Sequence, residues 1–187
     1  MKHQDQYMDI YSSMLAKGII FVNAKIDQRI AGLITTCLLY INETASIVQP
    51  KIYLNTNQGD VVSAMSVVDV MQYLKDNTKH KVNIETFGFG EIGIAAALIL
   101  TAGTKGFRNV ASHSQLGLYL GIESLEFSTI QGTEAKAKQQ EKMREKVVEL
   151  FTQFSGLDAM LIMAHLNKQD YFDANEAQEK GYIDGII

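Results

Sequence analysis

Residues 90–106 read GEIGIAAALILTAGTKG, and this stretch decides the fold. Its residues 92–102 are apolar except for Gly93 and Thr101, so they predict a helix that is buried on most sides. The run is well short of the roughly 20 residues that a membrane crossing needs, and the glycines that follow it end the helix. We therefore expect this helix at the centre of the domain, with the other elements packed around it.

Short β-type runs and helical runs alternate on both sides of this stretch, which is the pattern of an α/β domain. The predicted strands cover residues 19–22, 51–55, 82–87 and 116–120. The predicted helices cover residues 27–42, a segment that begins at the N-cap Asp60, residues 92–102, residues 133–155, and two short helices capped by Asp158 and by an Asp173 capping box. No linker or repeat divides the chain, so residues 1–187 are expected to form one domain.

Composition narrows the classes of protein that fit. The chain is 47% hydrophobic with a net charge of −4, which describes an ordered globular protein and argues against a nucleic-acid binder. The lone Cys37 excludes an internal disulfide, and no apolar segment is long enough for a membrane. A cytoplasmic or organelle-stromal location is expected. No cofactor or metal site is predicted, because the glycines at 88, 90 and 93 match a dinucleotide fingerprint only approximately.

Four segments, taken in order along the chain, form a specific set of landmarks. They are Asp9-Ile10-Tyr11-Ser12 with Gly18-Ile19-Ile20-Phe21; Tyr53-Leu54-Asn55 leading to Met65, Asp69 and Met71; Ala102-Gly103-Thr104-Lys105-Gly106 with Arg108; and Phe172, Ala174, Glu176-Ala177 and Gly181-Tyr182-Ile183-Asp184. In this order they resemble the proteolytic subunit of the Clp protease, over residues from about Asp9 to Ile187. The resemblance implies a crotonase-like spiral of ββα units with a protruding handle helix, here about residues 133–155. It also implies handles that join two seven-membered rings, whose mouths receive a AAA+ unfoldase.

The chemistry of that family does not follow from these residues. Peptide hydrolysis needs a serine nucleophile, a histidine base, an orienting aspartate and an oxyanion hole. Counted from the landmarks, the three side-chain positions hold Ile94, Tyr119 and His165. The paired glycines of the oxyanion turn correspond to Gln58 and Gly59. The resemblance thus identifies a catalytically degenerate member of the family.

Shifting the alignment does not restore a nucleophile. An insertion between Lys75 and Gly90 allows the serine position to move to Ile92 or Glu91, yet residues 67–111 contain no serine. Asp60 is expected to add a negative charge near the oxyanion position. Outside these positions, His113 lies between two serines. Because neighbouring residues on a strand point to opposite faces, we interpret it as a surface histidine.

The preferred hypothesis is a non-catalytic subunit that assembles into rings, with itself or with active paralogues. One alternative is a crotonase-like hydrolase or acyl-processing enzyme that uses Glu91, Tyr119 or His165. Others are a binding module that uses the ring as a scaffold, and serine-type peptidase activity supplied only by active partner subunits. Only eight residues precede Asp9, so a reduced axial gate is expected. Val68 stands where the family places an aromatic residue for unfoldase docking, which argues against that partner.

Overall fold

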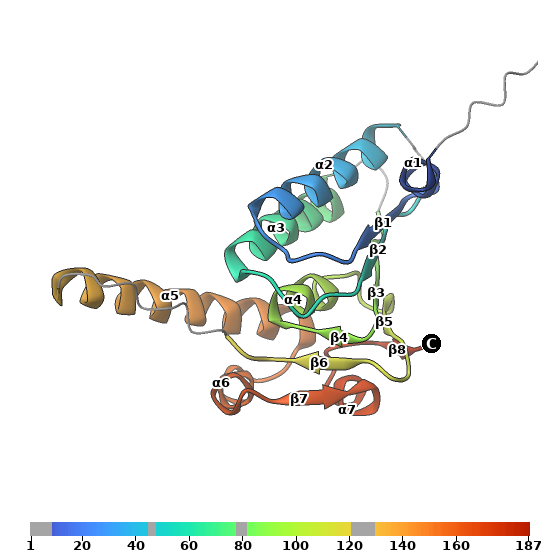
Figure 1. Cartoon of the computed structure of the whole chain (residues 1–187). Helices are drawn as coiled ribbons and strands as arrows, with labels where there is room; N and C mark the ends of the chain where they lie inside the picture. The colour runs from blue at the N-terminus through green and yellow to red at the C-terminus, as the bar shows by residue number, and fades with distance from the viewer. Residues whose placement is uncertain (1–8, 45–47, 78–81, 121–129) are drawn as a thin grey trace, which may run out of the picture.

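Two β-sheets, together with the helices that follow their strands, make up the fold (Figure 1). The computed structural model describes residues 9–44, 48–77, 82–120 and 130–187. The larger sheet has the order β1-β2-β3-β5-β8 and is parallel throughout; its strands are β1 (Ile19–Val22), β2 (Lys51–Leu54), β3 (Glu85–Gly88), β5 (Arg108–Val110) and β8 (Gly185–Ile186). The smaller sheet has the order β4-β6-β7; its strands are β4 (Glu91–Ile92), β6 (Gln115–Gly117) and β7 (Tyr171–Asp173). In it, β4 pairs parallel with β6, and β6 pairs antiparallel with β7.

The connections repeat one unit. The chain runs from β3 in the larger sheet to β4 in the smaller sheet and then into α4 (Ile94–Thr101). It repeats this path from β5 to β6 and then into α5 (Ile130–Ser155). Two successive ββα units thus wind between the same two sheets, as the resemblance implies.

Helices cover one face of the larger sheet. The two long ones, α2 (Gln28–Thr44) and α3 (Val61–Asn77), pack against each other, and α3 packs on α4 (Figure 1). All eight residues of α4 are buried, which confirms a central apolar helix. The predicted start at residue 92 is wrong, because Ile92 belongs to β4 and Gly93 is extended. Before β1, the short α1 (Ile10–Leu15) begins at the N-cap Asp9.

Several predicted strands need correction. The strand predicted at 82–87 is β3, which begins at Glu85, and the one predicted at 116–120 is β6, which spans Gln115–Gly117. The structure adds β4, β5, β7 and β8, which the sequence did not predict. Each of these has only two or three residues, too few for an alternating pattern to show.

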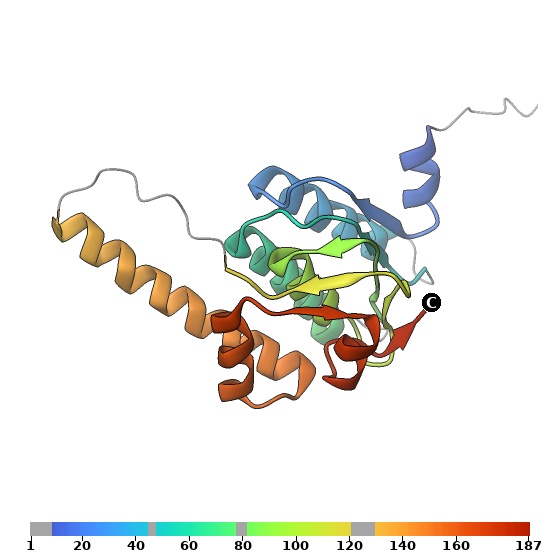
Figure 2. The ribbon, with the colours of Figure 1, turned by 60° about the horizontal axis from the view of Figure 1, so that its bottom comes forward.

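The handle helix α5 projects from the body of the molecule (Figures 1 and 2). It begins at Ile130, three residues before the predicted start, and residues 137–142 along it are exposed. Its second half carries Val147, Leu150 and Phe151 into the core. The two short helices that follow are α6 (Ala159–Lys168) and α7 (Ala174–Glu179). The capping box of Asp173 and Glu176 is confirmed.

A buried ion pair fixes the C-terminal strand to the larger sheet. Arg108 on β5 is 2% exposed, and its guanidinium binds both carboxylate oxygens of Asp184. The same guanidinium donates to the carbonyl oxygen of Phe154, at the base of α5, over 3.0 Å. Although burial opposes it, hydrogen bonds from Arg108 and its positive charge hold the pKa of Asp184 below its usual value. This Arg108 joint therefore ties the tail, the sheet and the handle together.

Candidate functional site

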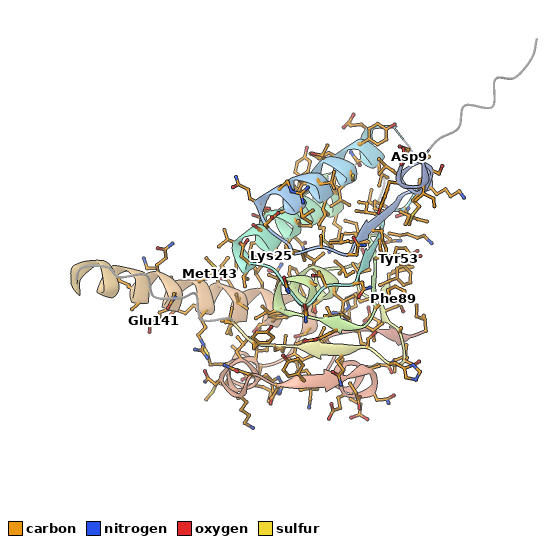
Figure 3. The ribbon with its side chains drawn as sticks, viewed as in Figure 1. Asp9, Lys25, Tyr53, Phe89, Glu141 and Met143 are labelled. Carbon is orange, nitrogen blue, oxygen red and sulfur yellow. The ribbon has the colours of Figure 1, made fainter. Side chains whose placement is uncertain are left out.

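A hollow of about 280 Å³ opens where four segments of the chain meet. Its lining residues are Lys25, Asn57, Gln58, Gly59, Ile94 and Tyr119. They come from the approach to α2, the turn before α3, the start of α4 and the residues after β6 (Figure 3). Four of the five residues predicted at the site, namely Gln58, Gly59, Ile94 and Tyr119, are therefore brought together.

The turn at residues 56–59 forms one wall of the hollow. The backbone N–H of Gln58 donates to Thr56 Oγ1 over 3.2 Å, and the backbone carbonyl oxygen of Gln58 accepts from the Ile26 N–H over 3.1 Å. A side chain on Gly59 would place its Cβ 2.8 Å from Ile26 Cβ and 2.9 Å from Ala95 Cβ. The turn is thus tightly held at Gly59, while the Gln58 side chain is exposed.

The opposite wall is the start of α4. The Gly93 N–H donates to the Thr56 carbonyl oxygen over 3.1 Å, and a Cβ on Gly93 would overlap the Asn57 carbonyl oxygen. Ile94 is the first helical residue and is 6% exposed. Its hydrocarbon side chain has no proton to lose and no lone pair to attack with. The head of the central helix therefore presents an aliphatic group to the hollow.

Tyr119, which lines the hollow, contacts Tyr171 of β7. The rings of Tyr119 and Tyr171 lie with their centroids 5.9 Å apart. The pKa of Tyr171 is raised, first by partial burial and then by the nearby Tyr119 and Glu91 and a hydrogen bond with Tyr119. Glu91 itself accepts a hydrogen bond from Asn57 Nδ2 over 2.9 Å and is not among the residues that line the hollow.

His165 lies elsewhere. It is 6% exposed inside the core, its Nδ1 is 2.9 Å from the Tyr182 hydroxyl, and its ring meets the Phe172 ring edge-on at 4.9 Å. Burial lowers its pKa, so the neutral imidazole is favoured. Within the part of the chain that the structure describes, His165 packs against Phe172 and Tyr182 and does not line the hollow. Among the described residues, the ring contacts of His165 are with Phe172 and Tyr182, not with Tyr119.

Two smaller expectations need correction, and one stays a prediction. Asp60 Oδ1 accepts the Ser63 N–H over 2.7 Å, so Asp60 caps α3 as predicted, and its expected charge near the oxyanion position stays a prediction. Val68 was expected in a docking groove, but it is 1% exposed and faces the core. Ser112 and His113 were expected to be unable to bond, yet Ser112 Oγ lies 3.1 Å from His113 Nδ1, because both occupy a turn. His113 is exposed, as expected of a surface histidine.

A family model for the Clp protease matches residues 2–187. The chain belongs to the Clp protease family. Its fold is the crotonase-like fold of that family, and membership supports a protease-core subunit connected with proteolysis. Members of the Clp protease family form rings, which supports self-association of this chain in general terms.

Within residues 9–44, 48–77, 82–120 and 130–187, no three His, Cys, Asp or Glu side chains gather where they could hold a metal ion. Among the helices in those ranges, none is both long and apolar enough to cross a membrane.

Sequence reasoning missed three residues at or beside the hollow of this Clp-family chain. They are Lys25, Asn57 and Tyr171. Lys25 is brought in by the isolated bridge between Ile26 and Gly59, a pairing between distant segments that leaves no local pattern. Tyr171 reaches Tyr119 through the β6–β7 pairing, and β7 was not predicted. Only the pairing of these segments in the fold could have revealed Lys25 and Tyr171, whereas Asn57 directly precedes the predicted Gln58 in the chain.

Proposed function

We propose that this chain is a non-catalytic subunit of a Clp-type assembly, with one domain over residues 1–187. The observation that carries the proposal is Ile94 at the head of α4, inside the hollow. A serine-type mechanism requires an oxygen nucleophile beside a base and an oxyanion hole. Among the residues that the structure describes, no serine, cysteine or threonine side chain lines this hollow.

The base position adds to the proposal. Tyr119 lines the hollow, and a phenol is a poor general base at neutral pH because it keeps its own proton there. His165, counted to the position of the orienting acid, lies in the core against Tyr182. The hollow thus combines an aliphatic group and a phenol where hydrolysis would need a nucleophile and a base.

The handle supports an assembling role. Residues 137–142 of α5 are exposed, and an unsupported helix is only marginally stable in water. Packing against other subunits would stabilise that half of α5. We propose that the chain assembles with itself or with active paralogues, in which case any serine-type peptidase activity belongs to those partners.

A crotonase-like enzyme is the second candidate, because Glu91 and Tyr119 both lie close enough to Tyr171 to act on its pKa. Its support is weaker. Glu91 is held by the Asn57 amide and does not line the hollow, and His165 is remote from its lining residues. An acyl substrate bound in the hollow would therefore meet Tyr119 and Ile94, and neither is an efficient base.

Val68 is buried, but another surface of the molecule supports the docking of an unfoldase. On the face of the larger sheet away from α2 and α3, Tyr53 stacks on Phe87 at 4.7 Å and on Phe89 at 5.9 Å (Figure 3). Phe21, in register with Tyr53 across β1 and β2, is 38% exposed. Because parallel sheets are usually covered on both faces, this aromatic row supports a docked partner with apolar side chains. We include an AAA+ unfoldase as that partner.

Two measurements test the proposed function. A fluorophosphonate probe, which labels activated serines, should leave the purified chain unlabelled at its own mass, while an active Clp protease in the same tube is labelled. Negative-stain imaging and sedimentation should show rings, either of the chain alone or after mixing with an active paralogue. Labelling of this chain would refute the non-catalytic role, and a chain that stays monomeric in both samples would refute the assembling role.

A further inference from the structure

The hollow is lined by hydrogen-bond donors that the described chain does not use. The Lys25 ammonium makes no ion pair or hydrogen bond with any residue in the described ranges. The side-chain amide of Gln58 is exposed and has no partner there either. The Tyr119 hydroxyl also lines the hollow and shares a hydrogen bond with Tyr171, and a hydroxyl can both donate and accept.

The nearby carboxylates do not pair with these donors, because each of them accepts a hydrogen bond from another group. Glu91 accepts from Asn57 Nδ2, and Asp60 accepts from the Ser63 N–H. Asp27, two residues beyond Lys25, accepts the Ile30 N–H over 2.9 Å and caps α2. None of the three is among the residues that line the hollow. The lining is therefore cationic and rich in donors, a combination that selects an anion.

An apolar surface lies beside these donors. Ile94 and the ring of Tyr119 line the same hollow as Lys25 and Gln58. A carboxylate attached to an aliphatic side chain can therefore place its charge at Lys25 and its side chain against Ile94. A small acid such as acetate would leave the apolar surface unfilled. The matching chemistry is that of a peptide C-terminus, which carries both groups on one residue.

We propose that the hollow binds the C-terminal carboxylate of a peptide and leaves the peptide intact. The inference rests on the proposed function, because a peptide remains whole in this site only where no nucleophile attacks it. Lys25 pairs with the carboxylate, while Gln58 Nε2 and the Tyr119 hydroxyl donate to its oxygens. Ile94 contacts the side chain of the last residue. The positions that would cleave peptides in an active subunit thus retain a peptide end in this one.

Calorimetric titration of the whole chain with three probes tests this site. The probes are N-acetyl-Ala-Ala-Leu with a free carboxylate, the same peptide with a C-terminal amide, and sodium acetate. We expect the peptide acid to bind about tenfold more tightly than the amide, since one charge-assisted contact is worth about a factor of ten. Acetate should bind no better than the amide. Lys25→Gln should lower the affinity for the peptide acid to that for the amide, whereas Lys105→Gln, beyond the other end of α4, should leave it unchanged.

The outcomes separate this inference from the proposed function. Equal affinities for acid and amide, no binding of the acid, or an unchanged affinity in Lys25→Gln would overturn the carboxylate site. Acetate that binds as tightly as the peptide acid would overturn the assignment to a peptide end. Each of these results leaves the non-catalytic role standing. Mass spectrometry of the titrated peptide tests that role separately: an intact peptide agrees with it, and shortened fragments would overturn it.

Discussion

The hollow and the Arg108 joint both bring together polar side chains from distant segments. At the joint these side chains have partners, whereas at the hollow some of them have none in the described chain. At the joint, Arg108 is 2% exposed, and its guanidinium is satisfied by Asp184 and the Phe154 carbonyl oxygen. At the hollow, Lys25 and Gln58 face open space without partners in the described chain. Satisfied, buried groups serve the fold, whereas open donors in a hollow are free to serve a ligand.

The two regions also differ in how they relate to the four segments that resemble the Clp family. Arg108 and Asp184 belong to the segments that resemble the Clp family, and the structure shows these two side chains holding the tail to the sheet. Ile94 and Tyr119 stand at positions where the family's chemistry would require other residues. We therefore propose that the chain keeps residues that build the subunit and lacks those that would cleave a peptide.

The largest effect is expected from breaking the joint. Arg108→Met should lower the free energy of unfolding by ~3–5 kcal/mol, because it leaves the largely buried Asp184 carboxylate unpaired. Chemical denaturation measures the loss. Lys51→Met is the control: it breaks the more exposed 3.2 Å pair with Glu85 on the same sheet and should cost about 1 kcal/mol or less. Equal losses in the two variants would contradict the structural role given to Arg108.

A smaller effect is expected from disturbing the wall of the hollow. The backbone of Gly93 suits any residue, but an added Cβ would overlap the Asn57 carbonyl oxygen. Gly93→Ala should therefore lower the free energy of unfolding by ~1–3 kcal/mol. Gly32→Ala is a matched control, since no atom lies within 4 Å of its added Cβ and α2 should gain about 0.5–1 kcal/mol. A harmless Gly93→Ala would mean that α4 and the turn are less tightly packed than described.

The smallest effect is expected in the pH dependence of stability that His165 causes. It tests whether this side chain lies in the core or in the hollow. Burial holds the pKa of His165 below its usual 6.5, so the unfolded chain binds more protons near and below that pH. The stabilisation is therefore present above pH 6.5 and is lost as the pH falls. Denaturation between pH 7.5 and 5 should show this loss in the wild type and in His113→Asn, and a flatter profile in His165→Asn. An unchanged slope in His165→Asn would contradict a buried neutral imidazole.

Local signals predicted the elements that carry their own pattern. The apolar run before Gly103 indicated the central helix, and the caps Asp60 and Asp173 marked the starts of α3 and α7. The resemblance to the Clp protease implied a protruding handle helix, and α5 projects from the body. The same reasoning failed for strands of two or three residues such as β4 and β7, because their pairing depends on partners elsewhere in the chain.

The residues of the site likewise fall into those that the sequence predicted and those that it did not. Counting from the landmarks located Ile94, Tyr119, Gln58 and Gly59, and the structure brings these four together. Counting also led to His165, but a position in the chain does not determine which way a helical side chain turns, and α6 turns this one into the core. Lys25 carries no local signal at all, since only the Ile26–Gly59 bridge brings its segment to the hollow.

Hydrolysis of a fluorogenic peptide by the purified chain tests the central claim most directly. With Ile94 and Tyr119 in the hollow, we expect no turnover above buffer at neutral pH, while an active Clp protease cleaves the same peptide. The variants Ile94→Ala and Tyr119→Phe should match the wild type at this baseline. Turnover by the wild type that falls in either variant would contradict the account, because a contaminating protease would not respond to substitutions in this hollow.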